Sequence, residues 1–160
     1  MSSGVKKTNA MRMLDSAKIP YEVRTYEFEE TDLAGIHAAD AVGMPYETVF
    51  KTLVARGDKT GFVVFCIPVA EELDLKKAAR ASKNKSVELL HVKDLLPTTG
   101  YIRGGCSPVG MKKEFPTYID ETAMLFDAIA VSGGIRGVQL IVNPDQLLGF
   151  VKGEYVDLTA

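Results

Sequence analysis

Residues 48–68 read TVFKTLVARGDKTGFVVFCIP, and no other segment of the chain constrains the architecture as strongly. The runs Thr48–Arg56 and Phe62–Ile67 are rich in β-branched and aromatic residues, which favour strands. Both runs are apolar on both faces, as expected for strands in the buried centre of a sheet. Between them lies GDKTG, whose glycines permit the backbone angles of a tight turn, and Pro68 ends the second run. We therefore predict a β-hairpin at the centre of the core.

A helix, a strand and a second helix are predicted before this hairpin. The first helix begins after Thr8, a residue type that caps helices, keeps apolar residues at helical spacing and ends before Pro20. Residues 21–28, YEVRTYEF, alternate between apolar and polar side chains as in a half-buried strand. The second helix is short and is closed by Gly43, since glycine commonly follows the end of a helix.

The segments after the hairpin indicate the fold class. Residues 71–81 are predicted to form a helix that turns Leu75, Ala78, Ala79 and Ser82 inward. Short strands are expected at residues 87–90, 117–120, 128–131, 138–142 and 154–158, with a helical turn after Pro144. Strands and helices do not alternate regularly, as they would in a doubly wound protein. We predict an α+β fold with a mixed, barrel-like β-sheet surrounded by helices.

The length and composition indicate one domain. The 160 residues suffice to close a single hydrophobic core, which we expect to span residues 8–160 behind a flexible start at residues 1–7. Hydrophobic residues make up 46% of the chain and charged residues 25%, as in ordinary soluble proteins. The longest apolar run, Phe62–Ala70, is half as long as a membrane-spanning helix, and no apolar signal segment opens the chain. These features favour a cytoplasmic protein without a membrane partner.

The charges argue against a protein that binds nucleic acid tightly along its backbone. The formal net charge is −2, whereas such binding needs a strongly basic surface, so DNA is not an expected partner. A brief contact with one RNA end is compatible with the basic residues Lys76, Lys77, Arg80, Lys83, Lys85, Lys112 and Lys113. Cys66 and Cys106 lie far apart, without a CxxC motif or a nearby histidine pair. Neither a disulfide, a metal site nor a cofactor is therefore expected.

Lys51 is the most informative single residue. The segment VFKTLV places its ammonium group within a strand whose neighbouring side chains are apolar, and strand alternation sets it beside Val49 and Leu53. A buried, unpaired lysine costs several kcal/mol or loses its proton, so such a placement usually has a reason. One interpretation is an edge-strand lysine that blocks aggregation. The other is a positive group that lines a pocket for an anionic or carbonyl-bearing ligand.

Two glycine-rich segments, at residues 104–110 (GGCSPVG) and 132–137 (SGGIRG), are each expected to follow a strand. Glycines allow a ligand to approach backbone N–H groups, which can bind phosphate or stabilise an oxyanion. The alternative is a pair of tight turns at sheet ends. The spacing of Gly105 and Gly110 matches a P-loop, but Met111 stands where a P-loop requires lysine, and neither segment contains GxGxxG. Nucleotide-hydrolase and Rossmann functions are therefore excluded.

Candidate nucleophiles are weak in this sequence. Cys106 and Ser132 each lie beside a glycine without the local signature of a catalytic nucleophile, and small side chains are common in such turns. His37 and His91 are far from both in sequence and are expected on helix surfaces. A cysteine hydrolase stays open only as a minor alternative.

Taken in order, the motifs of this chain resemble those of the YbaK family of trans-editing aminoacyl-tRNA deacylases, relatives of the editing insert of bacterial prolyl-tRNA synthetases. The resemblance covers nearly the whole chain. The matching segments are Ile19–Tyr21 with the strand ending at Tyr26, Gly35 with Ala38-Ala39, Val49–Leu53, Leu73–Ala79, Thr99–Tyr101 leading to Gly104–Gly110, and Val131–Gly134 with Arg136-Gly137.

The resemblance implies an α+β fold and hydrolysis of mischarged tRNA, in this branch Cys-tRNA(Pro), at the aminoacylated 3′ end. It implies catalytic roles for Lys51, Gly104 and Ser132 and substrate contacts from Tyr26, Phe50, Thr52, Gly105, Ser107, Gly133 and Arg136. In this branch the thiol of the substrate attacks its own ester, so no protein nucleophile is implied. Prolyl-tRNA synthetase is the implied protein partner.

Two alternatives stay open beside the cysteine-specific enzyme. One is a deacylase for Ala-tRNA(Pro) or another aminoacyl-tRNA, and the other is a module that binds a charged tRNA end or a synthetase without hydrolysis. His37 and Cys106 depart from the residues that the family has at these places. These departures bear on substrate choice more than on fold.

Overall fold

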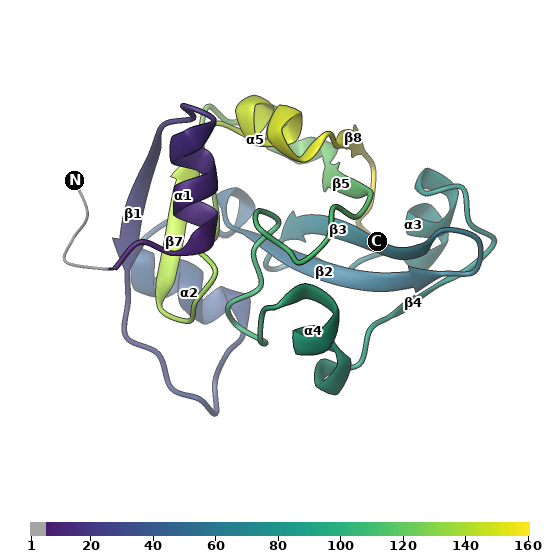
Figure 1. Ribbon diagram of the computed structural model, residues 1–160, viewed down its shortest axis with the longest axis horizontal. Coiled ribbons are helices and arrows are strands. Elements are labelled where there is room, and N and C mark those ends of the chain that lie inside the picture. The colour runs from purple at the N-terminus through teal and green to yellow at the C-terminus, as the bar shows by residue number, and fades with distance from the viewer. Residues whose placement is uncertain (1–5) are drawn as a thin grey trace.

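The computed structural model describes residues 6–160 and contains helices packed around two β-sheets (Figure 1). Of the expected flexible start, residues 1–5 lie outside the described residues. The helices are α1 (Asn9–Ser16), α2 (Gly35–Val42), α3 (Leu75–Ala81), α4 (Val92–Thr99) and α5 (Pro144–Val151). The strands are β1 (Tyr21–Thr25), β2 (Phe50–Gly57), β3 (Gly61–Pro68), β4 (Val87–Leu89), β5 (Thr117–Asp120), β6 (Ile129–Ser132), β7 (Val138–Val142) and β8 (Glu154–Val156).

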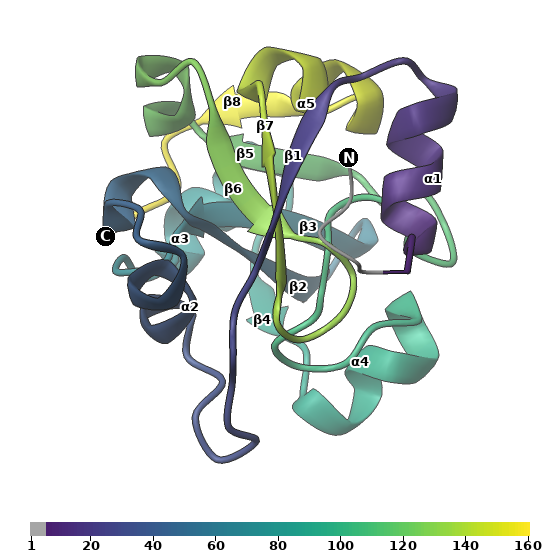
Figure 2. The same ribbon diagram turned by 90° about the vertical axis from the view of Figure 1, so that its left-hand side faces the viewer.

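The strands form an antiparallel sheet in the order β1-β7-β6 and a mixed sheet in the order β4-β2-β3-β5-β8. Figure 2 shows the first sheet crossing in front of the β2–β3 hairpin. The two sheets meet at a parallel bridge between Val49 and Ala130. The α+β class predicted from the sequence is confirmed. The expected barrel is only a loose description, because the sheet does not close.

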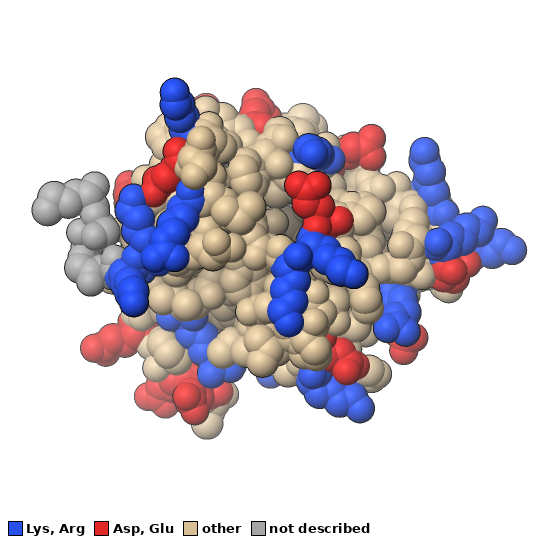
Figure 3. Space-filling model, viewed as in Figure 1, with Lys and Arg blue, Asp and Glu red and all other residues tan. Residues whose placement is uncertain are grey.

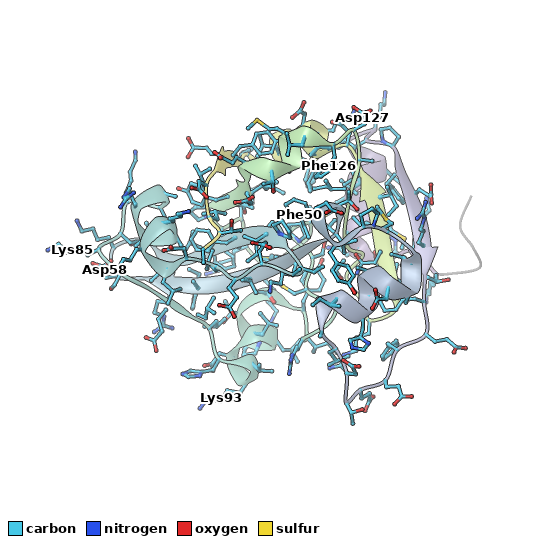
Figure 4. All side chains as sticks on the ribbon, turned by 180° about the vertical axis from the view of Figure 1, so that it is seen from behind. Phe50, Asp58, Lys85, Lys93, Phe126 and Asp127 are labelled. Atoms are coloured by element: carbon cyan, nitrogen blue, oxygen red, sulfur yellow. The ribbon has the colours of Figure 1, made fainter. Side chains whose placement is uncertain are left out.

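The predicted central hairpin is confirmed. Strands β2 and β3 pair from Phe50 opposite Pro68 to Gly57 opposite Gly61, and the residues of β3 from Val63 to Pro68 are buried. Asn84 holds the turn, since its side-chain oxygen accepts hydrogen bonds from the backbone N–H groups of residues 59 and 60 at 2.9 and 3.0 Å. Figure 4 shows Phe50 in the interior, with Asp58 and Lys85 at the tip of the hairpin.

The first helix follows the prediction closely. The Thr8 hydroxyl accepts a hydrogen bond from the Met11 N–H and so caps α1. Met11 and Leu14 are fully buried against both sheets in the largest core cluster. Burying side chains of this size typically contributes about 1.5–3 kcal/mol each. This packing holds α1 against the core that the two sheets share.

Several predicted elements differ from the structure. Strand β1 ends at Thr25 and not at residue 28, because its partner strand begins at Val138. Helix α3 begins at Leu75 and not at residue 71, because the Asp74 carboxylate accepts hydrogen bonds from the next turn and caps it there. Leu75 is 46% exposed, so its predicted inward position is wrong, whereas Ala78, Ala79 and Ser82 are buried.

Helix α4 was not predicted, and it is important for the site described below. It contains Pro97 near its end, a residue that normally argues against a helix. Gly100 closes the helix with a positive φ of 88°. Figure 2 shows α2 and α4 on either side of the region below β2. Among residues 6–160, no helix is long and apolar enough to cross a membrane.

Candidate functional site

A cavity of about 440 Å³ lies between β2, the ends of β6 and β7, and helices α2 and α4. Its wall is mainly apolar, with contributions from Leu33, Ile36, Val49, Leu53, Val54, Leu90, Val92 and Leu95. The polar side chains in the wall are those of Tyr26, Lys51, Thr52, Arg103, Cys106, Ser132 and Gln139. A mainly apolar cavity of this volume with a few polar groups is typical of a small-molecule site.

Lys51 contributes the cavity's cation from β2. Its side chain is partly buried and makes no hydrogen bond or ion pair with another residue in the described part of the chain. Burial lowers the pKa of its ammonium group below that of an ordinary lysine, and the nearby Glu72 and Glu71 oppose this shift. The side chain lies at the wall of a cavity rather than freely in solvent, which favours the pocket interpretation over an edge-strand lysine.

The bridge between the two sheets places Ser132 at the level of Lys51. Val49 bridges Ala130 in the parallel direction, and Lys51 and Ser132 each lie two residues further along. Residues two apart in a strand share a face, so both side chains turn towards the cavity. Ser132 is 9% exposed, and its hydroxyl accepts a hydrogen bond from the Gly134 N–H at 3.2 Å.

The two glycine-rich segments pack directly against each other. A side chain at Gly105 would lie 3.1 Å from the backbone of Ile135, so only glycine fits without displacement. The Arg136 guanidinium donates a hydrogen bond to the carbonyl oxygen of Arg103 at 2.9 Å and ties the two bends together. Gly104, with a φ of 86°, reaches the cavity wall. Bare backbone therefore faces the same cavity as the lysine.

Not every backbone N–H group of the two glycine-rich bends is free to bind a ligand. The Gly105 N–H donates to the carbonyl oxygen of Ile102 at 2.9 Å, and the Gly133 N–H donates to that of Val138. These two groups are already satisfied within the fold. The Gly104 N–H has no hydrogen-bond partner within residues 6–160 and is a free backbone donor at this wall.

The cavity gathers some of the sequence-predicted site residues and not others. Tyr26, Phe50, Lys51, Thr52, Gly104 and Ser132 line it, whereas Gly105, Ser107, Gly133 and Arg136 do not. Ser107 is fully buried, and its hydroxyl accepts a hydrogen bond from the Val109 N–H at 3.2 Å. Gly133 packs against the Val138 side chain. Arg136 lines an adjoining hollow of about 610 Å³, which shares Tyr26 and Gly104 with the cavity.

The thiols and imidazoles are poorly placed for nucleophilic catalysis. Burial raises the pKa of Cys106, which lines the cavity, to about 12, and burial does the same for Cys66 behind Thr52. Both thiols therefore stay protonated near neutral pH, where a nucleophilic cysteine needs its thiolate. His37 lies in the adjoining hollow, 3.0 Å from the Asp32 carboxylate, and His91 precedes α4. Neither imidazole lines the cavity.

Gln139 is a cavity residue that the sequence interpretation missed. It lies on β7 and is 5% exposed, and its side-chain oxygen has no hydrogen-bond partner among the described residues. The same signal that identified Lys51 was present, namely a polar side chain within a run of buried apolar residues, VQLIV. Arg103 was also missed, because it lies in a loop without such a pattern.

The surface charges match the slightly acidic balance of the sequence. Figure 3 shows basic side chains in separate groups with acidic ones between them, and a concentration at the end that carries the β2–β3 turn and α3. Lys77 in that region is already bound, because its amine lies 2.9 Å from the Asp157 carboxylate and donates to the Thr159 carbonyl oxygen. Within residues 6–160, no three His, Cys, Asp or Glu side chains cluster as a metal site would require.

Within residues 6–160 the fold forms a mainly apolar cavity whose wall carries a cation and bare backbone, without a phosphate-binding loop or a catalytic triad at that wall. Comparison with known families agrees with this class: the chain belongs to the aminoacyl-tRNA editing domain family, whose model matches residues 32–150. The family membership inferred from the sequence motifs is thereby confirmed, and with it the assignment as an aminoacyl-tRNA editing enzyme.

Individual relatives support the same placement. The chain is 51% identical over 154 residues to the Enterococcus faecalis protein EbsC, provisionally named a Cys-tRNA(Pro)/Cys-tRNA(Cys) deacylase, with 96% of this chain and 94% of EbsC covered. A crystal structure described provisionally as a trans-editing enzyme for prolyl-tRNA synthetase matches with a TM-score of 0.80, at 24% identity, over 97% of this chain and 99% of that one. The hypothetical protein APE2540 matches with a TM-score of 0.84, at 17% identity, over 93% of this chain and 97% of that one. The two structures show the shared fold.

Proposed function

We propose that this protein is a trans-editing deacylase that removes cysteine from mischarged tRNA, with Cys-tRNA(Pro) as its main substrate. The single observation that carries the proposal is the unpaired Lys51 ammonium at the wall of a mainly apolar cavity, beside Gly104 and Ser132. The deacylase name of EbsC, at 51% identity over nearly the whole chain, supports the choice of cysteine.

The proposed reaction uses the substrate's own thiol as the nucleophile. The sulfur attacks the ester carbonyl carbon, a carbon–sulfur bond forms, and the bond from that carbon to the ribose oxygen breaks. The thiol proton goes to the departing ribose hydroxyl, and the cyclic thiolactone is later hydrolysed by water. This route is consistent with Cys66 and Cys106 being protonated and with both histidines lying outside the cavity.

The residues at the cavity wall would stabilise and orient the reacting ester. Negative charge develops on the carbonyl oxygen during attack, and preorganised positive groups and N–H donors stabilise it most effectively in a site shielded from water. Lys51 and the free N–H of Gly104 are the candidates for this role. Tyr26, Phe50, Thr52 and Ser132 would position the aminoacyl group against the apolar wall.

Incubation of the purified protein with single aminoacyl-tRNAs tests the proposal. Cys-tRNA(Pro), Ala-tRNA(Pro), Cys-tRNA(Cys) and correctly charged Pro-tRNA(Pro) are followed by loss of the labelled amino acid. We expect rapid loss of cysteine and retention of proline. Loss of alanine alone would indicate an alanine-specific deacylase, and binding without loss of any ester would indicate a non-catalytic module. Either result contradicts the proposed substrate.

Selectivity for one tRNA requires a separate explanation. The chain has a formal net charge of −2 and no strongly basic surface, and weak docking of an RNA end needs only some phosphate contacts. We therefore propose that discrimination among tRNAs is supplied by prolyl-tRNA synthetase as a partner. A pull-down of the synthetase by this protein, with and without tRNA(Pro), checks the association. Equal deacylation of Cys-tRNA(Cys) and Cys-tRNA(Pro) when the synthetase is present would contradict it.

A further inference from the structure

The side-chain oxygen of Gln139 is a buried acceptor that the fold itself leaves unused. Among residues 6–160 it is the one side-chain nitrogen or oxygen atom that is fully shielded from solvent without a hydrogen-bond partner. A buried acceptor without a donor destabilises the folded protein. The other residues of β7 are apolar, and an apolar side chain in place of Gln139 would avoid this cost. A ligand that supplies a donor would remove this penalty.

The position of Gln139 connects it to the proposed catalytic groups. It pairs with Ser132 across the β6–β7 ladder, and directly paired residues of an antiparallel sheet present their side chains on the same face. Lys51 lies at the level of Ser132 in the neighbouring strand. All three residues line the same cavity.

No neighbouring residue supplies the missing donor. Arg24 lies opposite Gln139 on β1, but its guanidinium contacts Glu22 and donates to the carbonyl oxygen of Val42. The Ser132 hydroxyl accepts a hydrogen bond from the Gly134 N–H and lies beyond hydrogen-bond distance of the Gln139 oxygen. The Gln139 oxygen is shielded from solvent in this conformation, so a donor in the cavity reaches it once the side-chain amide turns towards the cavity.

The chemistry of an aminoacyl ester indicates which donor this is. A tRNA is far too large for a cavity of about 440 Å³, so the amino acid at its 3′ end enters first and reaches the most buried wall. The strong donor on that amino acid is its α-amino group, whereas a thiol is a weak one. The adenosine ribose, by contrast, lies nearer to the solvent.

We infer that the side-chain oxygen of Gln139 accepts a hydrogen bond from the α-amino group of the bound aminoacyl ester and so orients its carbonyl towards Lys51 and Gly104. This inference rests on the proposed deacylase function. It makes Gln139 a substrate-positioning residue that distinguishes an ester with a free amino group from one without it. Because the side-chain amide is neutral, Gln139 accepts this hydrogen bond without placing a further charge beside Lys51.

The test combines a protein variant with a substrate variant. Gln139→Met keeps the length of the side chain and removes the acceptor, and Gln146→Met, at an exposed position on α5, is the matched control. Each protein is assayed with Cys-tRNA(Pro) and with 3-mercaptopropionyl-tRNA(Pro), which keeps the thiol and ester but lacks the amino group. We expect Gln139→Met to lower kcat/KM for the cysteinyl ester about tenfold to a hundredfold, as for loss of a hydrogen bond to a charged group, and to leave the deamino ester unchanged within about twofold. Gln139→Glu, which keeps an acceptor, should retain the preference for the amino-bearing ester.

Several outcomes would overturn the assignment. An equal loss on both esters would mean that Gln139 acts on folding or cavity shape alone. The fall in kcat/KM of Gln139→Met could also persist with the deamino ester but disappear with a tRNA whose terminal adenosine lacks the 2′-hydroxyl. That result would assign the donor to the ribose. If Gln139→Met does not fold, equal kcat/KM of the wild-type protein for the two esters refutes the inference by itself. Failure of the wild-type protein to hydrolyse any cysteinyl ester would contradict the proposed function instead, and the inference would fall with it.

Discussion

Replacement of Lys51 by methionine removes the charge from the cavity while keeping most of the side-chain volume. Two unit charges about 4 Å apart attract by about 4 kcal/mol in a partly shielded protein site. Loss of one group that stabilises an oxyanion typically raises the barrier by about 3 kcal/mol. Since the Lys51 ammonium is partly buried and has no partner of its own among residues 6–160, we expect single-turnover deacylation of Cys-tRNA(Pro) to fall roughly a hundredfold or more.

The same substitution should leave the fold intact. Burial lowers the pKa of Lys51, which means that the folded state binds its proton less tightly than the unfolded chain does. Stability therefore rises with pH between the lowered pKa of Lys51 and the ordinary lysine pKa, and at neutral pH, below both, the buried charge costs stability. The Lys51→Met variant should accordingly have a Tm at or above that of the wild type.

The assay compares Lys51→Met with Lys59→Met, which removes an exposed lysine from the β2–β3 turn of the same hairpin. Single-turnover rates with Cys-tRNA(Pro) and thermal unfolding are measured for both. We expect Lys59→Met to deacylate at the wild-type rate. Wild-type activity of a folded Lys51→Met protein would refute the reasoning, and a large loss of Tm would show that Lys51 acts on the fold.

Three further predictions follow from the site and its surroundings. Lys51 acts as a cation with a lowered pKa, so the ratio of the wild-type rate to the Lys51→Met rate should fall towards one as pH rises through the Lys51 pKa. This fall should occur below the pH at which an exposed lysine titrates. A ratio that stays constant up to the pH of an exposed lysine would contradict the prediction. Cys106→Ala should keep deacylation within a fewfold of wild type, since burial holds the Cys106 thiol pKa near 12, whereas loss of activity in the folded variant would indicate a cysteine hydrolase. Asn84→Ala should lower the free energy of unfolding by about 2 kcal/mol in urea denaturation, because Asn84 bonds the hairpin turn to Ser82, and an unchanged unfolding midpoint would contradict that role.

Local patterns were enough to predict the hairpin, helix α1 and the position of Lys51 within a strand of that hairpin. Strand alternation and helix capping depend on residues next to one another, so TVFKTLVARGDKTGFVVFCIP and the Thr8 cap could be interpreted without knowledge of the rest of the chain. The ordered motifs likewise identified the family. Helix α4 escaped prediction because Pro97 overrides the local helical signal, although packing tolerates it near the helix end.

The composition of the cavity depends on contacts between segments far apart in the chain. The bridge from Val49 to Ala130 brings Lys51 to the level of Ser132, and the β6–β7 ladder then adds Gln139 to the same wall. The apolar run around Gln139 predicts that this polar residue is buried. It does not predict which face of the sheet the side chain lies on or that it lines the cavity. That placement follows from how the two sheets pack, which is set by the whole core and not by any one segment.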